Sequence, residues 1–280
     1  MLPKIRLCDT QFAHNPECSF GAGDLKIKPT FFEWNRSANK AENDIVVMTE
    51  SCMKLVDMQP EKIRILLILE PPCINAYTYQ WIKQPDNYAK FDYILTYNSE
   101  LLNLDKKFVS FVFGGCWIKP EDRKIHEKTK DISIIASWKK NTEGQRLRHE
   151  VIERFGDKID VYGNGYKFVE NKLEALQDYR YSIVIENEQT EFLTEKLIDC
   201  FSVGTIPIYW GSQIVGKHFN MDGVFNFNDI NALETILNYV DDKIYNESID
   251  AIKSNFERAK EFCIPEDRIY QTFFKPVLGL

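Results

Sequence analysis

The sequence lacks the short motifs that mark several large enzyme classes. It contains no GxGxxG or GxxxxGK[ST] phosphate loop, no HExxH zinc helix and no GxSxG nucleophile elbow. Its seven cysteines are odd in number and scattered, without a CxxC pair, which argues against a disulfide framework and a zinc ribbon. It also has no acidic DxD triplet of the kind that chelates a metal onto a sugar nucleotide.

Positive charge and long apolar runs are scarce as well. The 280 residues include 35 Lys and Arg against 42 Asp and Glu, a net charge of −7, which disfavours a general nucleic-acid binder. No run approaches the roughly 18 apolar residues of a membrane span, and the opening residues lack the apolar stretch of a signal peptide. We therefore expect a soluble cytoplasmic protein, although a trimmed form of a membrane-anchored enzyme would look the same.

The chain does contain a regular alternation of short apolar runs and amphipathic stretches. Continuous apolar runs of this length are typical of buried parallel strands, and the stretches between them fit crossover helices. The predicted strands are Ile5–Cys8, Ile45–Met48, Ile63–Leu69, Tyr93–Thr96, Phe108–Phe113, Ile132–Ala136, Ile159–Tyr162, Ile183–Ile185, Ile206–Tyr209 and Val224–Phe227. The predicted helices are Gly144–Phe155, Glu195–Ser202, Ala232–Val240 and Ser248–Cys263.

A highly charged segment divides this alternation. Residues 119–130, "KPEDRKIHEKTK", combine charge with a proline and predict a linker. Strands and helices alternate on both sides of it, which indicates two α/β domains with mostly parallel sheets. We expect an N-terminal domain over 1–120, a C-terminal domain over 130–245 and a helical tail over 246–280 that packs back toward the N-terminal domain. Ligands in such sheets bind at the carboxyl ends of the strands, and here also between the domains.

The stretch "IENEQTEFLTEKLIDCFSVGTIPIYWG", residues 185–211, has an unusual pair of charges at a helix start. Thr194 is the predicted N-cap, so Glu195 and Lys196 fall in the first turn. Glu195 matches the helix dipole, whereas Lys196 opposes it unless an anion compensates. A helix N-terminus with a nearby lysine suits a phosphate. The plain alternative is a solvated Glu–Lys pair in a loop.

Two further residues are candidates for chemistry. Arg148, near the start of the helix in "SWKKNTEGQRLRHEVI", can fork onto a pyrophosphate, or it can be a surface arginine paired with Glu150 or Glu153. Glu70 follows a predicted strand and precedes two prolines. A carboxylate at the carboxyl tip of a strand is well placed as a general base, and the alternative is a polar strand end before a proline stop.

Taken together, these stretches resemble glycosyltransferase family 10, the α-1,3/1,4-fucosyltransferases. The similar segments are Ile185-Glu186-Asn187, the "TEK" of 194–196, the "GTIPIYWG" of 204–211, the "LEPP" of 69–72, and "SWKKNTEGQRLRHEVI" followed by "VYGNG". The likeness covers about residues 63–230.

The resemblance implies a GT-B architecture, in which two Rossmann-like domains face each other across a cleft. It implies GDP-fucose as the donor, held mainly by the C-terminal half, and an inverting transfer to a hydroxyl of an oligosaccharide that contains galactose or N-acetylglucosamine. It implies no metal site and no required cofactor, with at most a non-essential stimulation by Mn²⁺ or Mg²⁺.

The resemblance also implies roles for individual residues. The donor-binding set is Arg148, Asn187, Phe192, Glu195 and Lys196. Arg148 and Lys196 would contact the diphosphate, and Glu195 would hold the ribose hydroxyls. Phe192 stands where the family often has a tyrosine, so one phosphate hydrogen bond, worth roughly 1.5–3 kcal/mol when charge-assisted, is lost. Glu70 would be the general base.

Two other functions remain open from the sequence. The same fold can use another GDP-sugar, and a non-catalytic nucleotide-sugar or glycan-binding module can share the donor residues. The joint presence of Glu70, Arg148 and Lys196 argues against the binding module. Release of free GDP in the presence of donor and acceptor distinguishes an enzyme from such a module.

Overall fold

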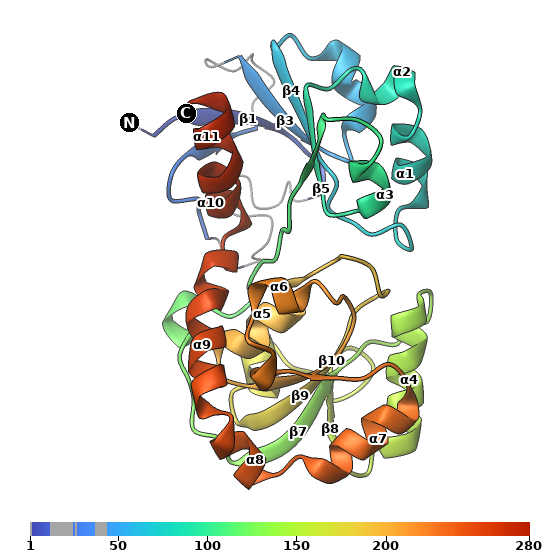
Figure 1. Cartoon of the computed structure of the whole chain (residues 1–280), viewed down its shortest axis with the longest axis vertical. Coiled ribbons are helices and arrows are strands. Elements are labelled where there is room, and N and C mark those ends of the chain that lie inside the picture. Colours follow the sequence, from blue (N-terminus) through green and yellow to red (C-terminus); the bar gives the residue numbers. More distant parts are fainter. Residues whose placement is uncertain (1, 12–24, 26, 37–43) are drawn as a thin grey trace. The chain divides into compact units, whose positions relative to one another are not determined.

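The computed structural model describes residues 2–11, 25, 27–36 and 44–280, and the chain forms two compact units. The first comprises residues up to 113 together with 264–280, and the second comprises residues 114–263. Each unit is an α/β domain built around one parallel sheet (Figure 1). The α/β class that the alternating apolar runs predict is confirmed.

The units divide at positions that differ from the predicted ones. The first unit ends at Phe113, so the charged segment 119–130 lies inside the second unit and is not a linker. Its Lys128 ammonium donates to the carbonyl oxygens of Gln177 and Val203 at 2.8 and 2.9 Å. These bonds fix the segment to the domain despite its charge. At the other end, residues 246–263 belong to the second unit and 264–280 to the first.

The sheet of the first unit has the order β2-β1-β3-β4-β5-β6 in the described part of the chain. Its strands are β1 (Lys4–Cys8), β2 (Glu33–Asn35), β3 (Ile45–Thr49), β4 (Ile63–Leu67), β5 (Tyr93–Thr96) and β6 (Phe108–Ser110). Its helices include α1 (Ala76–Ile82), α2 (Pro85–Tyr88) and α3 (Ser99–Leu102). The fully buried Val46, Leu66 and Ile94 of the sheet share one core with Ile82 of α1 and Leu101 of α3. These two helices therefore pack against the sheet.

The C-terminal segment completes the first unit. It contains α10 (Pro265–Ile269) and α11 (Lys275–Leu278), joined by a π-helical turn. The Phe274 ring meets Phe32 edge-on with centroids 5.5 Å apart, and Phe273 meets Tyr93 at 5.1 Å. These aromatic contacts hold residues at the end of the chain against residues near its beginning.

The sheet of the second unit has the order β11-β10-β9-β7-β8, with all pairs parallel. Its strands are β7 (Lys130–Ile135), β8 (Asp160–Tyr162), β9 (Tyr179–Ile185), β10 (Ile206–Trp210) and β11 (Phe225–Asn226). Its helices are α4 (Glu143–Phe155), α5 (Glu195–Ser202), α6 (Val215–His218), α7 (Ile230–Tyr239), α8 (Asp242–Glu247) and α9 (Ile249–Ala259). The strand order reverses between β7 and β9, which makes their carboxyl ends the topological switch point where doubly wound folds bind ligands.

The two faces of this sheet are covered by different helices. Ile183 and Ile185 of β9 share a core with Val151 and Phe155 of α4. Ser182, which points to the other face because side chains alternate along a strand, hydrogen-bonds with Cys200 of α5. The helices α4 and α5 therefore flank β9 from opposite faces, and their first turns meet at its carboxyl end.

Gly204 and Pro207 shape the connection from α5 into β10. Gly204 adopts φ +76° directly after the helix, a conformation that glycine takes without strain. Pro207 lies inside β10, where it lacks a donor, but β11 pairs only with Ile208 and Tyr209. The carbonyl of Tyr209 accepts from Phe227 on that side, so the missing N–H of Pro207 faces the same side beyond the short β11 pairing.

Four of the cysteines in the described part of the chain, Cys52, Cys116, Cys200 and Cys263, are buried. Buried cysteine thiols pack as small apolar side chains. None of the helices described combines the length and the apolar character that a membrane crossing requires.

Candidate active site

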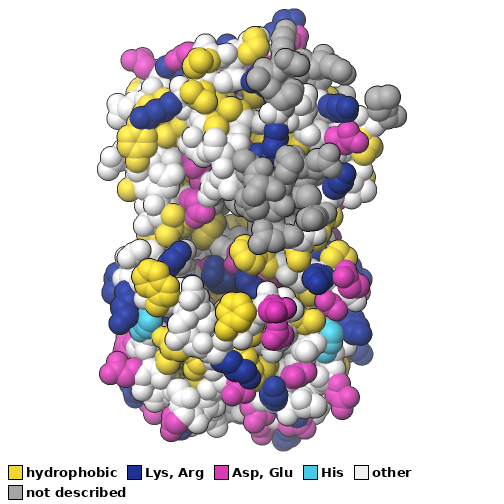
Figure 2. Space-filling model, turned by 180° about the vertical axis from the view of Figure 1, so that it is seen from behind, with side chains coloured by type: hydrophobic (Ala, Val, Ile, Leu, Met, Phe, Trp, Pro, Cys, Tyr) yellow, Lys and Arg dark blue, Asp and Glu magenta, His cyan; other side chains and the backbone are white. Residues whose placement is uncertain are grey.

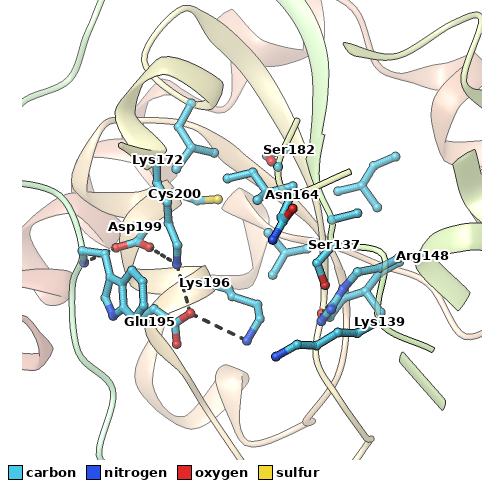
Figure 3. A pocket seen from close by; sticks show the side chains of 18 residues that line it. Ser137, Lys139, Arg148, Asn164, Lys172, Ser182, Glu195, Lys196, Asp199 and Cys200 are labelled. Atoms are coloured by element: carbon cyan, nitrogen blue, oxygen red, sulfur yellow. Dashed lines mark hydrogen bonds and ion pairs between the residues drawn. The ribbon is translucent and has the colours of Figure 1, made fainter. Parts of the chain in front are cut away.

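A cavity of about 430 Å³ lies at the carboxyl ends of β7 and β9, within the second unit. The residues that line it come from both strands, from the loops after β7 and β8, and from α4 and α5. Its polar lining consists of Ser137, Lys139, Arg148, Asn164, Lys172, Ser182, Glu195, Lys196 and Asp199 (Figure 3). The cavity therefore occupies the switch point of the sheet, and it collects most of the donor residues that the sequence predicts.

Arg148 reaches the cavity because α4 begins tightly against β9. Thr142 and Gln145 form a reciprocal capping box that fixes the first turn. A Cβ on Gly144 would lie 1.7 Å from the carbonyl oxygen of Glu186, so only glycine permits this approach. Arg148 is buried, and its guanidinium donates to the carbonyl of Ile185 from Nε at 3.1 Å and also from Nη2. It is therefore not the surface arginine paired with Glu150 or Glu153 that was the alternative.

Lys196 has the anionic partner that its position against the helix dipole requires. Its ammonium lies 3.0 Å from the carboxylate of Glu186, whose side chain is fully buried at the end of β9. Thr194, the N-cap of α5 as predicted, donates its hydroxyl to both oxygens of Glu186 at 2.7 and 3.0 Å. The solvated loop pair is thus excluded, because Lys196 belongs to a partly buried network.

Glu195 belongs to a second network, which is centred on Lys172. Lys172 lies between two carboxylates, 3.0 Å from Glu195 and 2.8 Å from Asp199 (Figure 3). The backbone N–H of Trp117 donates to the second oxygen of Asp199 at 2.6 Å, and the Trp117 ring lies 4.6 Å from the Lys172 ammonium. Glu195 also lies 3.8 Å from Lys196, so the two networks touch at this point.

These contacts shift the pKa values of the charged groups. Burial by itself raises the pKa of Glu195, but the attraction of Lys172 and Lys196 outweighs it and the pKa falls well below its ordinary value. Burial by itself lowers the pKa of Lys172, and Asp199 and Glu195 raise it above its ordinary value. Burial lowers the pKa of Arg148, against the pull of Glu186 and Glu195. At neutral pH the cavity therefore holds ionised lysine and glutamate side chains in fixed positions.

Sequence patterns did not predict Lys172, Asp199 or the pairing role of Glu186. Asp199 lies four residues after Glu195, on the same face of α5, inside the apolar stretch Leu197–Phe201. The signal available in the sequence was an acidic residue inside such an apolar stretch. The structure shows that this residue is 1% exposed. Lys172 lies in a short 3₁₀ helix in the long connection between β8 and β9, and no sequence pattern ties it to α5.

Two predicted donor residues stand outside the cavity lining. Asn187 and Phe192 belong to the loop between β9 and α5, and both are half-buried. The backbone carbonyl of Asn187 accepts from the N–H of Gly144 at 3.1 Å, so this residue helps to seat α4 on the strand end. Their side chains are not among those that line the cavity.

Glu70 lies in the first unit, beyond the carboxyl end of β4. The strand ends at Leu67, three residues before Glu70, so the predicted strand end at Leu69 was too long. Glu50, which follows β3, accepts from the N–H of Leu69 at 3.0 Å and from the N–H of Glu70 at 2.8 Å. Gln11 donates to a carboxylate oxygen of Glu70 at 3.2 Å. Glu70 is therefore half-buried in a connected polar group rather than a simple strand terminus.

The described residues give little indication of a metal site or of a nucleic-acid interface. Within the residues described, no group of three or more His, Cys, Asp or Glu side chains could hold a metal ion. On the face of the second unit in Figure 2, basic and acidic side chains are interspersed rather than gathered into a basic stripe. The cations of the cavity stand out because four of them, Lys139, Arg148, Lys172 and Lys196, line one site.

A family model decides the class of the second unit. The model for the C-terminal domain of glycosyltransferase family 10 (fucosyltransferase) matches residues 125–254. These residues belong to glycosyltransferase family 10. The sequence-based assignment to this family is confirmed, and with it the glycosyltransferase class of this domain. The match contains Arg148, Glu195 and Lys196 of the cavity but does not extend to Glu70.

A curated fucosyltransferase is similar to part of this chain. The α-(1,3)-fucosyltransferase FucT of Helicobacter pylori is 40% identical to this chain over 77 residues. The aligned part is 27% of this chain and 16% of that protein. The similarity therefore spans a small fraction of that relative's length.

Solved structures resemble the whole chain in fold. An α1,3-fucosyltransferase with GDP superposes with a TM-score of 0.55 at 16% identity, over 95% of this chain and 93% of the other. The same enzyme type with GDP-fucose gives a TM-score of 0.54 at 18% identity, over 93% and 89%. T4 phage β-glucosyltransferase gives 0.52 at 9% identity, over 98% and 99%. The fold of this chain is GT-B-like, as the resemblance implied.

Proposed function

We propose that this chain transfers fucose from GDP-fucose to a hydroxyl of a glycan acceptor, with inversion at the anomeric carbon. The observation that carries the proposal is the cavity at the switch point of the second unit, where Arg148, Lys139 and Lys196 surround space beside Glu195. Positive groups of this kind suit a nucleoside diphosphate. The family domain and the GDP-bound relatives support the choice of donor.

The proposed donor contacts follow from the atoms that are available. Arg148 uses Nε and Nη2 on the carbonyl of Ile185, and a guanidinium has five N–H donors in all. Its remaining donors serve the diphosphate, together with the Lys196 ammonium. Glu195 accepts from the ribose hydroxyls through its carboxylate. Asn187 and Phe192 belong to the loop that follows β9. Asn187 contributes by holding the start of α4 against the end of the strand rather than by lining the cavity.

The proposed reaction needs one base and a stabilised leaving group. Glu70 takes the proton of the acceptor hydroxyl while the hydroxyl oxygen attacks the anomeric carbon and the bond from that carbon to the diphosphate breaks. GDP leaves with the bonding electrons, and Arg148 and Lys196 stabilise the charge that develops on it. Glu50 and Gln11 hold the backbone and the carboxylate of Glu70 for this step. No metal is required, because the cationic side chains supply the positive charge.

A panel of GDP-sugars and UDP-sugars tests the donor. A ligand present at 100 times its dissociation constant stabilises the folded state by about 2.7 kcal/mol, which a thermal shift assay detects. We expect GDP and GDP-fucose to raise the melting temperature and UDP-glucose not to. A larger shift with another GDP-sugar would favour the alternative donor. A shift without GDP release in the presence of galactose or N-acetylglucosamine acceptors would favour a binding module.

A further inference from the structure

The two charged residues at the start of α5 are held apart by separate partners. Lys196 pairs with the buried Glu186 at 3.0 Å, whereas Glu195 pairs with Lys172 at 3.0 Å. The Lys196 ammonium also lies 3.8 Å from Glu195, a long ion pair that a small rotation would shorten. Such a pair would use the ammonium that is proposed for the diphosphate. The closer partners, Lys172 and Glu186, therefore keep Glu195 and Lys196 from forming a close pair with each other.

Lys172 is anchored more firmly than a surface lysine. Its side chain is 18% exposed, and its ammonium contacts Asp199, which is 1% exposed, at 2.8 Å. Asp199 is fixed in turn by the N–H of Trp117 at 2.6 Å, and the Trp117 ring packs 4.6 Å from the ammonium. Glu195 and Asp199 are four residues apart, so one ammonium can bridge both along the same face of α5. The position of Lys172 is thus set by groups that do not themselves contact a ligand in the proposed reaction.

The contacts of Glu195 are compatible with a further hydrogen bond. Lys172 and Lys196 both approach the same oxygen, Oε1. Neither pairing uses Oε2, which can accept from a vicinal pair of hydroxyls. A carboxylate that is held by one oxygen and accepts with the other is preorganised, because little side-chain freedom remains to be lost on binding.

We propose that Lys172 is the positioning residue that directs Glu195 to the ribose hydroxyls of the nucleotide and keeps it away from Lys196. The proposal rests on the proposed function, since it assumes a nucleoside diphosphate in the cavity. It gives Lys172 a role in the recognition of the ribose. Lys172 is not among the donor-binding residues that the resemblance implies. Asp199 and Trp117 support Lys172 from its other side, through the ion pair with Asp199 and the contact with the Trp117 ring.

The test compares GDP with 2′,3′-dideoxy-GDP by titration calorimetry. The unmodified protein should bind GDP roughly 10- to 100-fold more tightly, the range expected for hydrogen bonds from hydroxyls to a charged acceptor. In Lys172→Met this ratio should fall to near one, because Glu195 turns to Lys196. Lys172→Arg should restore part of the ratio, since a guanidinium can also bridge two carboxylates.

Lys139→Met is the matched control. It removes the same charge from the same cavity, but Lys139 has no ion pair with Glu195 among the contacts described. It should weaken GDP and dideoxy-GDP alike and leave their ratio at the unmodified value. If Lys172→Met does not fold because Asp199 is left without its cation, the double variant Lys172→Met/Asp199→Asn removes that carboxylate and serves for the same comparison.

The outcomes separate the two hypotheses. No GDP binding by the unmodified protein would overturn the proposed function. GDP binding without a preference over dideoxy-GDP would overturn the ribose role of Glu195 and the inference with it. A preference that persists unchanged in the folded Lys172 variants would overturn the inference alone and leave the proposed function intact.

Discussion

Replacement of Lys196 should reduce both the stability of the fold and the affinity for GDP, and the two effects can be separated. Lys196→Met leaves the carboxylate of Glu186, which is fully buried, with Thr194 as its remaining described partner in this network. Breaking a buried ion pair costs about 3–5 kcal/mol. Because the Lys196 side chain is 27% exposed and water can partly replace it, we expect about 2–3 kcal/mol. For a unit of 114–263, this lowers Tm by roughly 4–12 °C.

The double variant Glu186→Gln/Lys196→Met isolates the role in binding. A neutral amide at position 186 can still accept from Thr194 and no longer needs a cation, so most of the lost stability should return. GDP affinity should stay low, by about 2–4 kcal/mol or roughly 30- to 1,000-fold in Kd, because the ammonium is still absent. Urea unfolding and titration calorimetry measure the two quantities. If the double variant regained normal GDP affinity, Lys196 would serve only to neutralise Glu186.

Three other changes test separate parts of the account. Gly144→Ala should lower stability and weaken GDP binding together, because a Cβ 1.7 Å from the carbonyl oxygen of Glu186 forces α4, and Arg148 with it, away from β9; an unchanged melting temperature would contradict this. Burial raises the pKa of Glu50 from 4.5 to about 7, so between these values the folded chain keeps a proton that the unfolded chain releases. The contribution of Glu50 to stability should therefore be greatest below about pH 4.5 and fall by up to about 3 kcal/mol as pH rises through 7, and urea unfolding of Glu50→Gln should show a pH dependence that lacks this fall. Transfer activity should persist in EDTA, since cationic side chains stabilise the leaving group, and restoration of a lost activity by Mn²⁺ or Mg²⁺ would count against that mechanism.

The strands of the second unit and its helices α4, α5, α7 and α9 were predictable because each carries its own local signal, whereas α6 and α8 were not predicted. The buried strands β7, β9 and β10 are apolar along most of their length, and α5 was placed at Glu195–Ser202 from its N-cap and its apolar face. The common edge of parallel strands then brought Arg148 and Lys196 to one site. These inferences needed only periodicity and the rule that ligands bind at the carboxyl ends of strands.

The unit boundary was not predictable from composition. Charge and a proline at 119–130 resemble a linker, but the half-buried Lys128 ties that segment to the second unit through backbone carbonyls. The actual change of unit falls after Phe113, in an apolar stretch followed by Gly114 and Gly115. Both glycines have positive φ, at 75° and 113°, which is the conformational signal of a sharp turn.

Long-range ion pairs and hydrogen bonds were the other part that could not be predicted from the sequence. Lys172 is 23 residues from Glu195 and 27 from Asp199 along the chain, and Glu50 is 20 from Glu70. Pairings of this kind depend on how the loops meet at the sheet edge and leave no periodic pattern. The sequence therefore predicts three residues that line the cavity, Arg148, Glu195 and Lys196, but not Lys172, which pairs with Glu195.

The central claim is tested most directly by the turnover of GDP-fucose with a panel of galactose- and N-acetylglucosamine-containing acceptors, in the unmodified chain and in Glu70→Gln. The unmodified chain should release GDP only when an acceptor is present and should form a fucosylated product of inverted configuration. Glu70→Gln should bind GDP normally and lose roughly 10²–10⁴-fold in kcat, as expected for the loss of a general base. A Glu70→Gln chain with normal turnover would place the base elsewhere, and GDP-fucose that binds but is never turned over would contradict the assignment as a fucosyltransferase.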